Sequence, residues 1–352
     1  MATTWECNLR CAYCFVRDAV TQRGARMSPK LAARVVDALD GGLPDVEAIC
    51  VHLYGGEPLT NLPAMEALLE HSDARAPGRF SFAITTNGTI LDEAVFDLLE
   101  AGRFSVVLSI DGPAPVHDAC RCAADGSPTH ARVLEFLHTV RSRTRCEVRG
   151  SSVVRAGWSL AEATAYLRSL PVHAIKAQAV RAAQGSPFAL SPGDTRAYLR
   201  DLEAVGRQVI DDLEHGRVPR DDRFSSRVLQ LLAGQRRDAF CGAGDTTFGI
   251  TPTGHVVPCV LMDPAGCVLG HVGDPRHGWV EQGRRWREAR PVRPECQVCS
   301  ALDLCGGGCP AMMPVCGADE CDLTRKNCEV AAAIYEHFAD TPETLLTLAG
   351  IT

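Results

Sequence analysis

The spacing of three cysteines near the start of the chain is the first feature with chemical meaning. Cys7, Cys11 and Cys14 form a CxxxCxxC string. Three thiolates on one short loop can ligate three irons of a 4Fe-4S cubane, whereas a set of four would saturate the cluster. The fourth iron then stays open to bind another molecule. Zinc loops favour two CxxC pairs instead, so this string predicts an iron–sulfur site with an open position.

Most of the remaining cysteines gather near the other end of the chain. There are 17 cysteines among 352 residues, and ten of them lie between positions 241 and 328. A disulfide framework fits poorly, because the count is odd and no export signal opens the chain. Clustered cysteines in a reducing compartment indicate metal binding instead. Cys296-x2-Cys299 alone would also suit a zinc ribbon. Cys50 and Cys146 lie in apolar runs and are expected in the core.

Composition and charge limit the class of protein. Hydrophobic residues make up 46% of the chain, enough for a sizeable core, and the net charge of −7 argues against nucleic-acid binding. No stretch approaches the ~18 apolar residues of a membrane span, and no charged-then-apolar signal segment opens the chain. We therefore expect a cytoplasmic protein that binds neither nucleic acid nor membrane.

Strand-like and helix-like segments alternate over residues 1–215. Helix starts are expected at Ser28-Pro29 and Ser191-Pro192. The alternation predicts an α/β fold with a parallel sheet, either a barrel or a doubly wound sheet, with chemistry on the loops after the strands. Short β-branched runs predict strands at 47–54, 79–86, 103–110, 146–154 and 172–180. Helical patterns lie at 29–39, 62–70, 92–99, 129–142, 160–169 and 195–215.

The predicted organisation has three parts. Residues 1–215 form the α/β domain, 216–240 a polar linker and 241–352 a small cysteine-rich domain. In the last part, residues 251–254 predict a hairpin turn and 329–338 a closing helix. Only six residues precede the first cysteine of the triad, so either the first strand is very short or the start of the sequence is truncated or misannotated.

The string CNLRCAYCF resembles the signature of the radical S-adenosylmethionine (SAM) superfamily. The resemblance implies a partial (β/α)6 TIM-type barrel, in which an open iron is chelated by the amino and carboxylate groups of SAM. The cofactor is then cleaved to a 5′-deoxyadenosyl radical, which abstracts hydrogen from an unactivated C–H bond, while the protein binds and orients. Cys7, Cys11 and Cys14 would hold the catalytic cluster.

Other segments resemble the SAM-binding motifs of that family. Gly55-Gly56-Glu57-Pro58 is similar to its GGEP motif, in which the backbone and the glutamate hold the cofactor's amino group. Paired glycines permit close backbone approach, and a carboxylate suits an ammonium. By the same resemblance the cofactor-binding residues are Tyr13, Gly55, Gly56, Glu57, Pro58, Thr86, Asn87, Ser109, Asp111 and Arg149.

Several of these residues also suit a purely structural role. The polar residues after the strands are equally typical of Asx turns or helix caps, and Arg149 is typical of a structural ion pair. Tyr13 and Phe15, which would lie near the adenine, could equally belong to the core. Cys120 and Cys122 follow the fourth strand on the catalytic side, where they could touch substrate.

The C-terminal cysteines resemble the seven-cysteine signature of SPASM domains, which implies two auxiliary 4Fe-4S clusters. Some relatives add a ligand to the first cluster six residues after its first cysteine, where this chain has Thr247. That cluster is then either open or ligated by Cys267, Cys316 or Cys321. Cys321 is also an alternative to Cys328. The implied ligands are Cys241, Cys259 and Cys309 for the first cluster and Cys296, Cys299, Cys305 and Cys328 for the second.

The resemblance favours an enzyme that matures ribosomally made peptides by forming a thioether or carbon–carbon crosslink. Sulfatase-maturing relatives carry an aspartate directly after the Cys259 equivalent, where this chain has Val260, which argues against formylglycine formation. The alternatives are oxidation or epimerisation of a sugar or other small molecule, anaerobic sulfatase-type maturation, and a non-catalytic iron–sulfur or zinc protein. Expected partners are a precursor peptide and an electron donor such as flavodoxin or ferredoxin. Because no leader-binding module precedes the barrel, we expect the peptide to be recognised by the rim of the barrel, by the linker at 216–240 or by a separate leader-binding protein.

Overall fold

The computed structural model describes residues 1–14, 16, 24–102, 104–182, 185–262 and 266–350. The chain forms two compact units, each built from two stretches of sequence. Unit 1 comprises Met1–Arg149 and Gly242–Arg290, and unit 2 comprises Gly150–Cys241 and Pro291–Thr352. The three-part division predicted from the sequence stays a prediction, because a compact unit need not coincide with a sequence domain.

Six strands form one sheet in the order β1-β2-β3-β4-β5-β6. This unbroken chain order confirms the partial α/β barrel, because a doubly wound sheet reverses its strand order part-way. Neighbouring strands from β1 to β4 pair in parallel, and β1 has only three residues, as one of the two expectations for it required. The strands are β1 (Ala2–Thr4), β2 (Ile49–Gly55), β3 (Phe80–Thr86), β4 (Ser105–Ser109), β5 (Glu147–Val154) and β6 (Ala174–Ala179).

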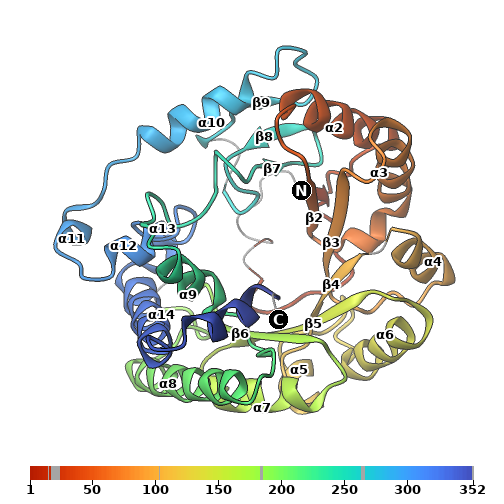
Figure 1. Ribbon diagram of the computed structural model, residues 1–352. Coiled ribbons are helices and arrows are strands. Elements are labelled where there is room, and N and C mark those ends of the chain that lie inside the picture. The colour runs from red at the N-terminus through yellow and green to blue at the C-terminus, as the bar shows by residue number, and fades with distance from the viewer. Residues whose placement is uncertain (15, 17–23, 103, 183–184, 263–265, 351–352) are drawn as a thin grey trace. The chain divides into compact units, whose positions relative to one another are not determined.

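Helices alternate with these strands, and each of the six predicted helices is present. Figure 1 shows α2, α3 and α4 along one side of β2, β3 and β4. In unit 1 the helices are α2 (Pro29–Gly42), η1 (Pro58–Asn61), α3 (Leu62–Arg75), α4 (Glu93–Ala101), α5 (Ala114–Asp118) and α6 (His130–Arg143). In unit 2 they are α7 (Leu160–Ser169), α8 (Pro192–Glu214) and α9 (Ser225–Leu232).

Side-chain caps explain where several of these helices begin. Ser28 Oγ accepts a hydrogen bond from Leu31 N at 3.2 Å at the start of α2. Ser159 and Ser191 form capping boxes at the starts of α7 and α8. A cap of this kind is worth about 1 kcal/mol. The predicted starts at Ser28-Pro29 and Ser191-Pro192 are confirmed.

Alternation along the strands places the core of unit 1. Leu53, Ile84 and Leu108, on β2, β3 and β4, are fully buried. The same alternation turns Cys50 of β2 to the exposed side, so its predicted core position is wrong. Cys146 is buried, as predicted. The physical reason is that successive strand residues face opposite sides of the sheet, and an apolar run does not reveal which side is covered.

The cysteine-rich C-terminal region contributes to both units. The predicted turn at 251–254 joins β7 and β8, and Gly254 has a φ of +86°, which favours glycine. In unit 1, β7 (Gly249–Ile250), β8 (His255–Val257) and β9 (Gly270–His271) form an antiparallel sheet followed by α10 (Trp279–Glu288). Unit 2 holds α11 (Pro294–Gln297), α12 (Leu302–Cys305), α13 (Met313–Cys316), α14 (Ala318–His337) and η3 (Pro342–Ala349).

The closing helix is longer than predicted. It begins at Ala318 rather than at 329, so Cys328 lies inside α14 and not directly before it. α14 packs against α8 and α9. A β-carbon on Gly206 of α8 would lie 2.3 Å from Val330 Cγ1, so the two helices approach closely there. This packing stabilises a helix whose first turns carry polar residues and gave no clear helical pattern. No helix in the described parts of the chain is long and apolar enough to cross a membrane.

Candidate active site

The cysteine loop follows β1 and is held in place by the segment after β4. Arg10 N donates to Cys122 O at 2.9 Å, and Ala12 N donates to Cys120 O at 2.8 Å. These two backbone bonds form a short antiparallel pairing between the segments. Cys120 and Cys122 therefore have a structural place beside the loop, while the thiols of the triad are half-buried.

Gly55 and Gly56 let the start of the chain pass directly against the end of β2. A β-carbon on Gly55 would lie 2.5 Å from Thr4 O, and one on Gly56 would lie 2.0 Å from Glu6 O. Gly55 also has a φ of +126°, which favours glycine. The expected close backbone approach is thus present, and the segment that approaches is the one leading into the cysteine loop.

Glu57 is buried at the carboxyl end of β2 and receives three hydrogen bonds. Asn87 N donates to Oε2 at 2.7 Å, while Thr86 Oγ1 and Leu59 N donate to Oε1 at 2.8 and 3.1 Å. Burial raises the pKa of Glu57 to about 7, although these hydrogen bonds oppose the shift. Pro58 begins η1 beside it. The structure thus brings together Glu57, Thr86 and Asn87, three of the residues that the resemblance assigns to cofactor binding.

Cys7 lies within a small network of neutral donors. Leu9 N donates to its Sγ at 3.4 Å, and Asn87 Nδ2 lies 3.8 Å from the same sulfur. Asn87 Nδ2 also donates to Asn8 Oδ1 at 2.9 Å, and Asn8 Nδ2 donates to Thr89 Oγ1 at 2.8 Å. Burial raises the pKa of the Cys7 thiol to about 12. A free thiol there holds its proton at neutral pH and loses it when a metal binds.

Cys11 lies beside a buried charged network that the sequence did not predict. Arg121 Nη1 is 4.0 Å from Cys11 Sγ, and Arg121 Nε donates to Asp111 Oδ1 at 3.0 Å. Tyr13 donates its hydroxyl proton to the other oxygen of Asp111. Burial raises the pKa of Tyr13 well above its usual value. Arg121 follows Asp111 by ten residues, and an isolated arginine between two cysteines was the single signal for it.

Other predicted residues have simpler surroundings. Ser109 ends β4 and is half-buried, and Arg149 is a half-buried residue of β5. Phe15 lies outside the described residues. Asn8 and Thr89, which orient Asn87, were missed because Asn8 occupies a position between the cysteines of the triad that the motif leaves open, and Thr89 follows the predicted polar segment.

The proposed ligands of the second auxiliary cluster all lie in unit 2. Cys299 and Cys305 are close enough to Cys328 to interact electrostatically with it, and Cys328 accepts a hydrogen bond from Arg227. Cys299 N donates to Cys296 O at 3.1 Å, so the CxxC pair forms one tight turn. Burial raises the pKa values of Cys305 and Cys328.

Cys321 lies beside Arg293 in unit 2. Arg293 Nη2 lies 3.2 Å from Cys321 Sγ and 3.4 Å from Cys296 Sγ. Cys321 and Cys328 are seven residues apart on α14, which puts both on one face of the helix. Both thus stay candidates for the last ligand. In the first set, Cys241 and Cys309 belong to unit 2 and Cys259 to unit 1, and that ligand set stays a prediction.

The residues around the triad fit an iron–sulfur cluster with SAM. The thiols provide the soft sulfur ligands that iron–sulfur clusters require. The N–H groups of Leu9, Asn87 and Arg121 point at the sulfurs of Cys7 and Cys11. The buried carboxylate of Glu57 is suited to an ammonium. Among the described residues, no three Cys, His, Asp or Glu side chains lie close enough together to hold a single metal ion. A cubane carries its ligands at its corners, so its sulfurs stand further apart.

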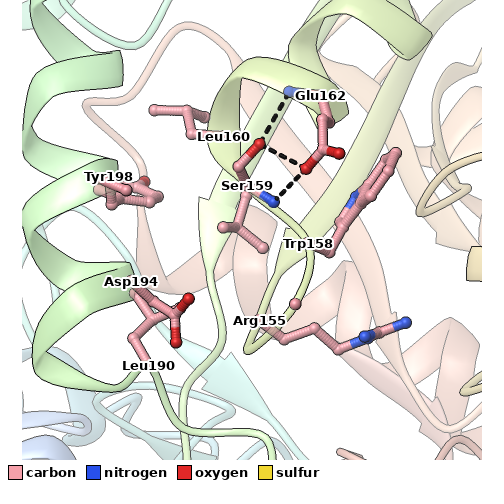
Figure 2. Close-up of a pocket in the computed structure, with 11 residues that line it drawn as sticks. Arg155, Trp158, Ser159, Leu160, Glu162, Leu190, Asp194 and Tyr198 are labelled. Atoms are coloured by element: carbon pink, nitrogen blue, oxygen red, sulfur yellow. Dashed lines mark hydrogen bonds between the residues drawn. The ribbon is translucent and has the colours of Figure 1, made fainter.

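A pocket of about 260 Å³ lies in unit 2, where β5 ends and α7 begins. Figure 2 shows Trp158, Leu160 and Tyr198 around it, with Glu162 hydrogen-bonded to Ser159. That carboxylate caps α7, as Asp194 caps α8. The two carboxylates that line this pocket therefore already form hydrogen bonds at helix starts. No predicted site residue lines the pocket.

Comparison with known proteins relates the chain to a family of enzymes. Residues 2–170 match the radical SAM superfamily. The cysteine-type anaerobic sulfatase-maturating enzyme of Clostridium perfringens (strain 13 / Type A) is 24% identical over 329 residues, which cover 86% of this chain and 85% of that protein. A match over 86% of this chain must extend into the cysteine-rich C-terminal region.

Two solved structures share the fold. Native anSMEcpe with bound AdoMet superposes with a TM-score of 0.80 at 20% identity, over 96% of this chain and 98% of that one. SuiB of Streptococcus suis, bound to its precursor peptide SuiA, gives a TM-score of 0.60 at 16% identity, over 88% of this chain and 71% of that one. Together with the cysteine loop and its surroundings, the family match over residues 2–170 and the likeness over most of the chain show that this is a radical SAM enzyme.

Proposed function

We propose that the protein is a peptide-modifying radical SAM enzyme with a SPASM-type auxiliary domain at 241–352. The observation that carries the proposal is the meeting of the cysteine loop with Glu57 and Asn87 in unit 1. When bound, the cluster and SAM supply hydrogen-atom abstraction from an unactivated C–H bond. Cys7, Cys11 and Cys14 would hold the cluster, and Glu57 would bind the amino group of the cofactor.

The other residues of the site would position the cofactor. Asn87 orients both Glu57 and Cys7, since its backbone N–H contacts the carboxylate and its amide lies beside the sulfur. Tyr13 and Asp111 would contact the adenosine part, and Ser109 and Arg149 the methionine part. Burial of Glu57, Thr86 and Asp111 excludes water from their side of the site, which strengthens each polar contact made there.

The cysteine-rich region would hold auxiliary clusters. The grouping of Cys299, Cys305 and Cys328 in unit 2 supports a cluster there, with Cys296 as the fourth ligand. Cys241, Cys259 and Cys309 would hold another, and Thr247 leaves that one open to a substrate thiolate or to a further cysteine. A flavodoxin or ferredoxin would supply electrons.

A peptide is the favoured substrate, because SuiB, with which the chain shares its fold, was solved with a precursor peptide bound. We propose a crosslink, either thioether or carbon–carbon. Forming a thioether removes one hydrogen atom from carbon, and one proton and one electron from the thiol. The electron would pass to an auxiliary cluster and then to the external carrier.

Oxidation of a peptide cysteine to formylglycine is the second candidate. Its support is the similarity to a cysteine-type sulfatase-maturating enzyme over 86% of this chain. Val260, at the position where the resemblance places an aspartate, argues against it. The products differ in composition: a crosslink loses two hydrogens and keeps sulfur, whereas formylglycine formation loses the sulfur.

The test is anaerobic reconstitution of wild type and Cys11→Ala, followed by assay of 5′-deoxyadenosine and of a co-expressed neighbouring small peptide by mass spectrometry. Wild type should cleave SAM and hold about 8–12 irons. Cys11→Ala should lose cleavage and keep auxiliary iron. Cleavage that persists in Cys11→Ala would refute the site, and a small-molecule product with unmodified peptide would refute the substrate class.

A further inference from the structure

A buried positive charge, that of Arg121, lies beside one of the three cysteines of the triad. We infer that Arg121 is a positioning residue that raises the reduction potential of the triad's cluster, by fixing a buried positive charge beside Cys11. The inference rests on the proposed ligation of that cluster by Cys7, Cys11 and Cys14. It assigns to Arg121 a tuning role on the electron that starts the reaction, separate from binding SAM.

Arg121 is fixed in place from both its side chain and its backbone. Its side chain is 11% exposed and bridges Cys11 Sγ at 4.0 Å and Asp111 Oδ1 at 3.0 Å through different nitrogens. Its guanidinium carbon lies 5.5 Å above the centre of the Tyr13 ring. Arg121 N donates to His117 O at 2.8 Å, and Thr129 donates its hydroxyl proton to Arg121 O. These contacts therefore hold the positive charge of the guanidinium in one position.

In the described part of the chain, the donors near Cys7 Sγ are neutral, namely the backbone N–H of Leu9 and the amide of Asn87, and the charge that acts on this thiol is the negative one of Glu57. Asp111 is fully buried and lies on the Nε side of the guanidinium, away from the nitrogen that faces Cys11. The ion pair thus directs its positive end at one sulfur of the triad. Screening by water and salt is weak at such a buried position.

Reduction adds one negative charge to the cluster. A fixed positive charge beside a ligating sulfur stabilises that added charge, and Asp111 opposes part of the effect from further away. Two substitutions that each remove one charge therefore have opposite expected signs. Arg121→Gln should make the cluster harder to reduce, and Asp111→Asn should make it easier. A purely structural role for the pair would not produce opposite shifts.

The test is a redox titration of the anaerobically reconstituted enzyme, followed by EPR of the cluster whose signal changes when SAM is added. Arg121→Gln should lower the equilibrium constant for reduction at least tenfold, about 59 mV for one electron. Asp111→Asn should shift it in the other direction. Arg10→Gln is the matched control, since exposed Arg10 donates to Cys7 O and Leu9 O in the same loop. Solvent screens its charge, so the potential should stay unchanged.

Each outcome is decisive. Opposite shifts in the two variants, with iron content retained, support the inference. An unchanged potential in Arg121→Gln, or the same shift in Arg10→Gln, overturns it. If Arg121→Gln fails to bind iron, Asp111→Asn decides alone: a rise in potential supports the inference, and a fall or no change overturns it. A wild type without any SAM-responsive signal would refute the proposed ligation itself.

Discussion

Glu57 should make the affinity for SAM depend on pH, with tighter binding at higher pH. Burial raises the pKa of this carboxyl to about 7 in the free protein. The bound cofactor places an ammonium against it, which requires the ionised form. Binding below pH 7 must therefore displace a proton from Glu57, and the affinity falls as the pH falls.

The size of the effect follows from that pKa. A group with a pKa of about 7 is roughly 90% protonated at pH 6 and roughly 10% at pH 8. SAM binding should thus release about 0.9 proton from Glu57 at pH 6 and about 0.1 at pH 8. The association constant should be about tenfold lower at pH 6 than at pH 8.

Isothermal titration calorimetry in buffers of different ionisation enthalpy measures both quantities. The cofactor's own amino group titrates near pH 8, at about the ordinary value for an α-amino group, so a reference is needed. Glu57→Gln supplies it, because it keeps the shape and removes only the carboxyl proton. The variant should bind more weakly at pH 8, by about 10- to 150-fold, since a hydrogen bond to a charged group is worth about 1.5–3 kcal/mol. The same proton release in Glu57→Gln as in wild type would refute the assignment of Glu57.

Three further outcomes test other parts of the site. Gly56→Ala should prevent loading of the triad's cluster, because its β-carbon would lie 2.0 Å from a backbone oxygen; Gly193→Ala, with its nearest atom at 3.6 Å, should load normally, and equal iron contents would contradict this. Cys328→Ala should lose about four irons while Cys321→Ala keeps them, as counted by iron and sulfide analysis; the reverse result would make Cys321 the ligand. Brief exposure to air should abolish SAM cleavage before auxiliary iron is lost, and activity that survives air would contradict an open cluster.

Local sequence patterns predicted much of the fold. Alternating strands and helices, with serine caps at Ser28 and Ser191, require little more than nearest-neighbour chemistry, and the structure has them where expected. Cys50 and the start of α14 differ from the predictions for one reason: both depend on which neighbour covers a surface. Burial is a property of the packed molecule, so an apolar or polar run in the sequence predicts it poorly.

The sequence by itself determined the family and the residues of its motifs, because the triad and the GGEP segment act through short fixed spacings. The tertiary structure alone decided what surrounds them. It brings the segment before the cysteine loop against the two glycines of the GGEP segment. It also raises the pKa of Glu57 by burial and places Arg121 beside Cys11. Those effects arise between segments far apart in sequence, and electrostatics and packing depend on distance in space.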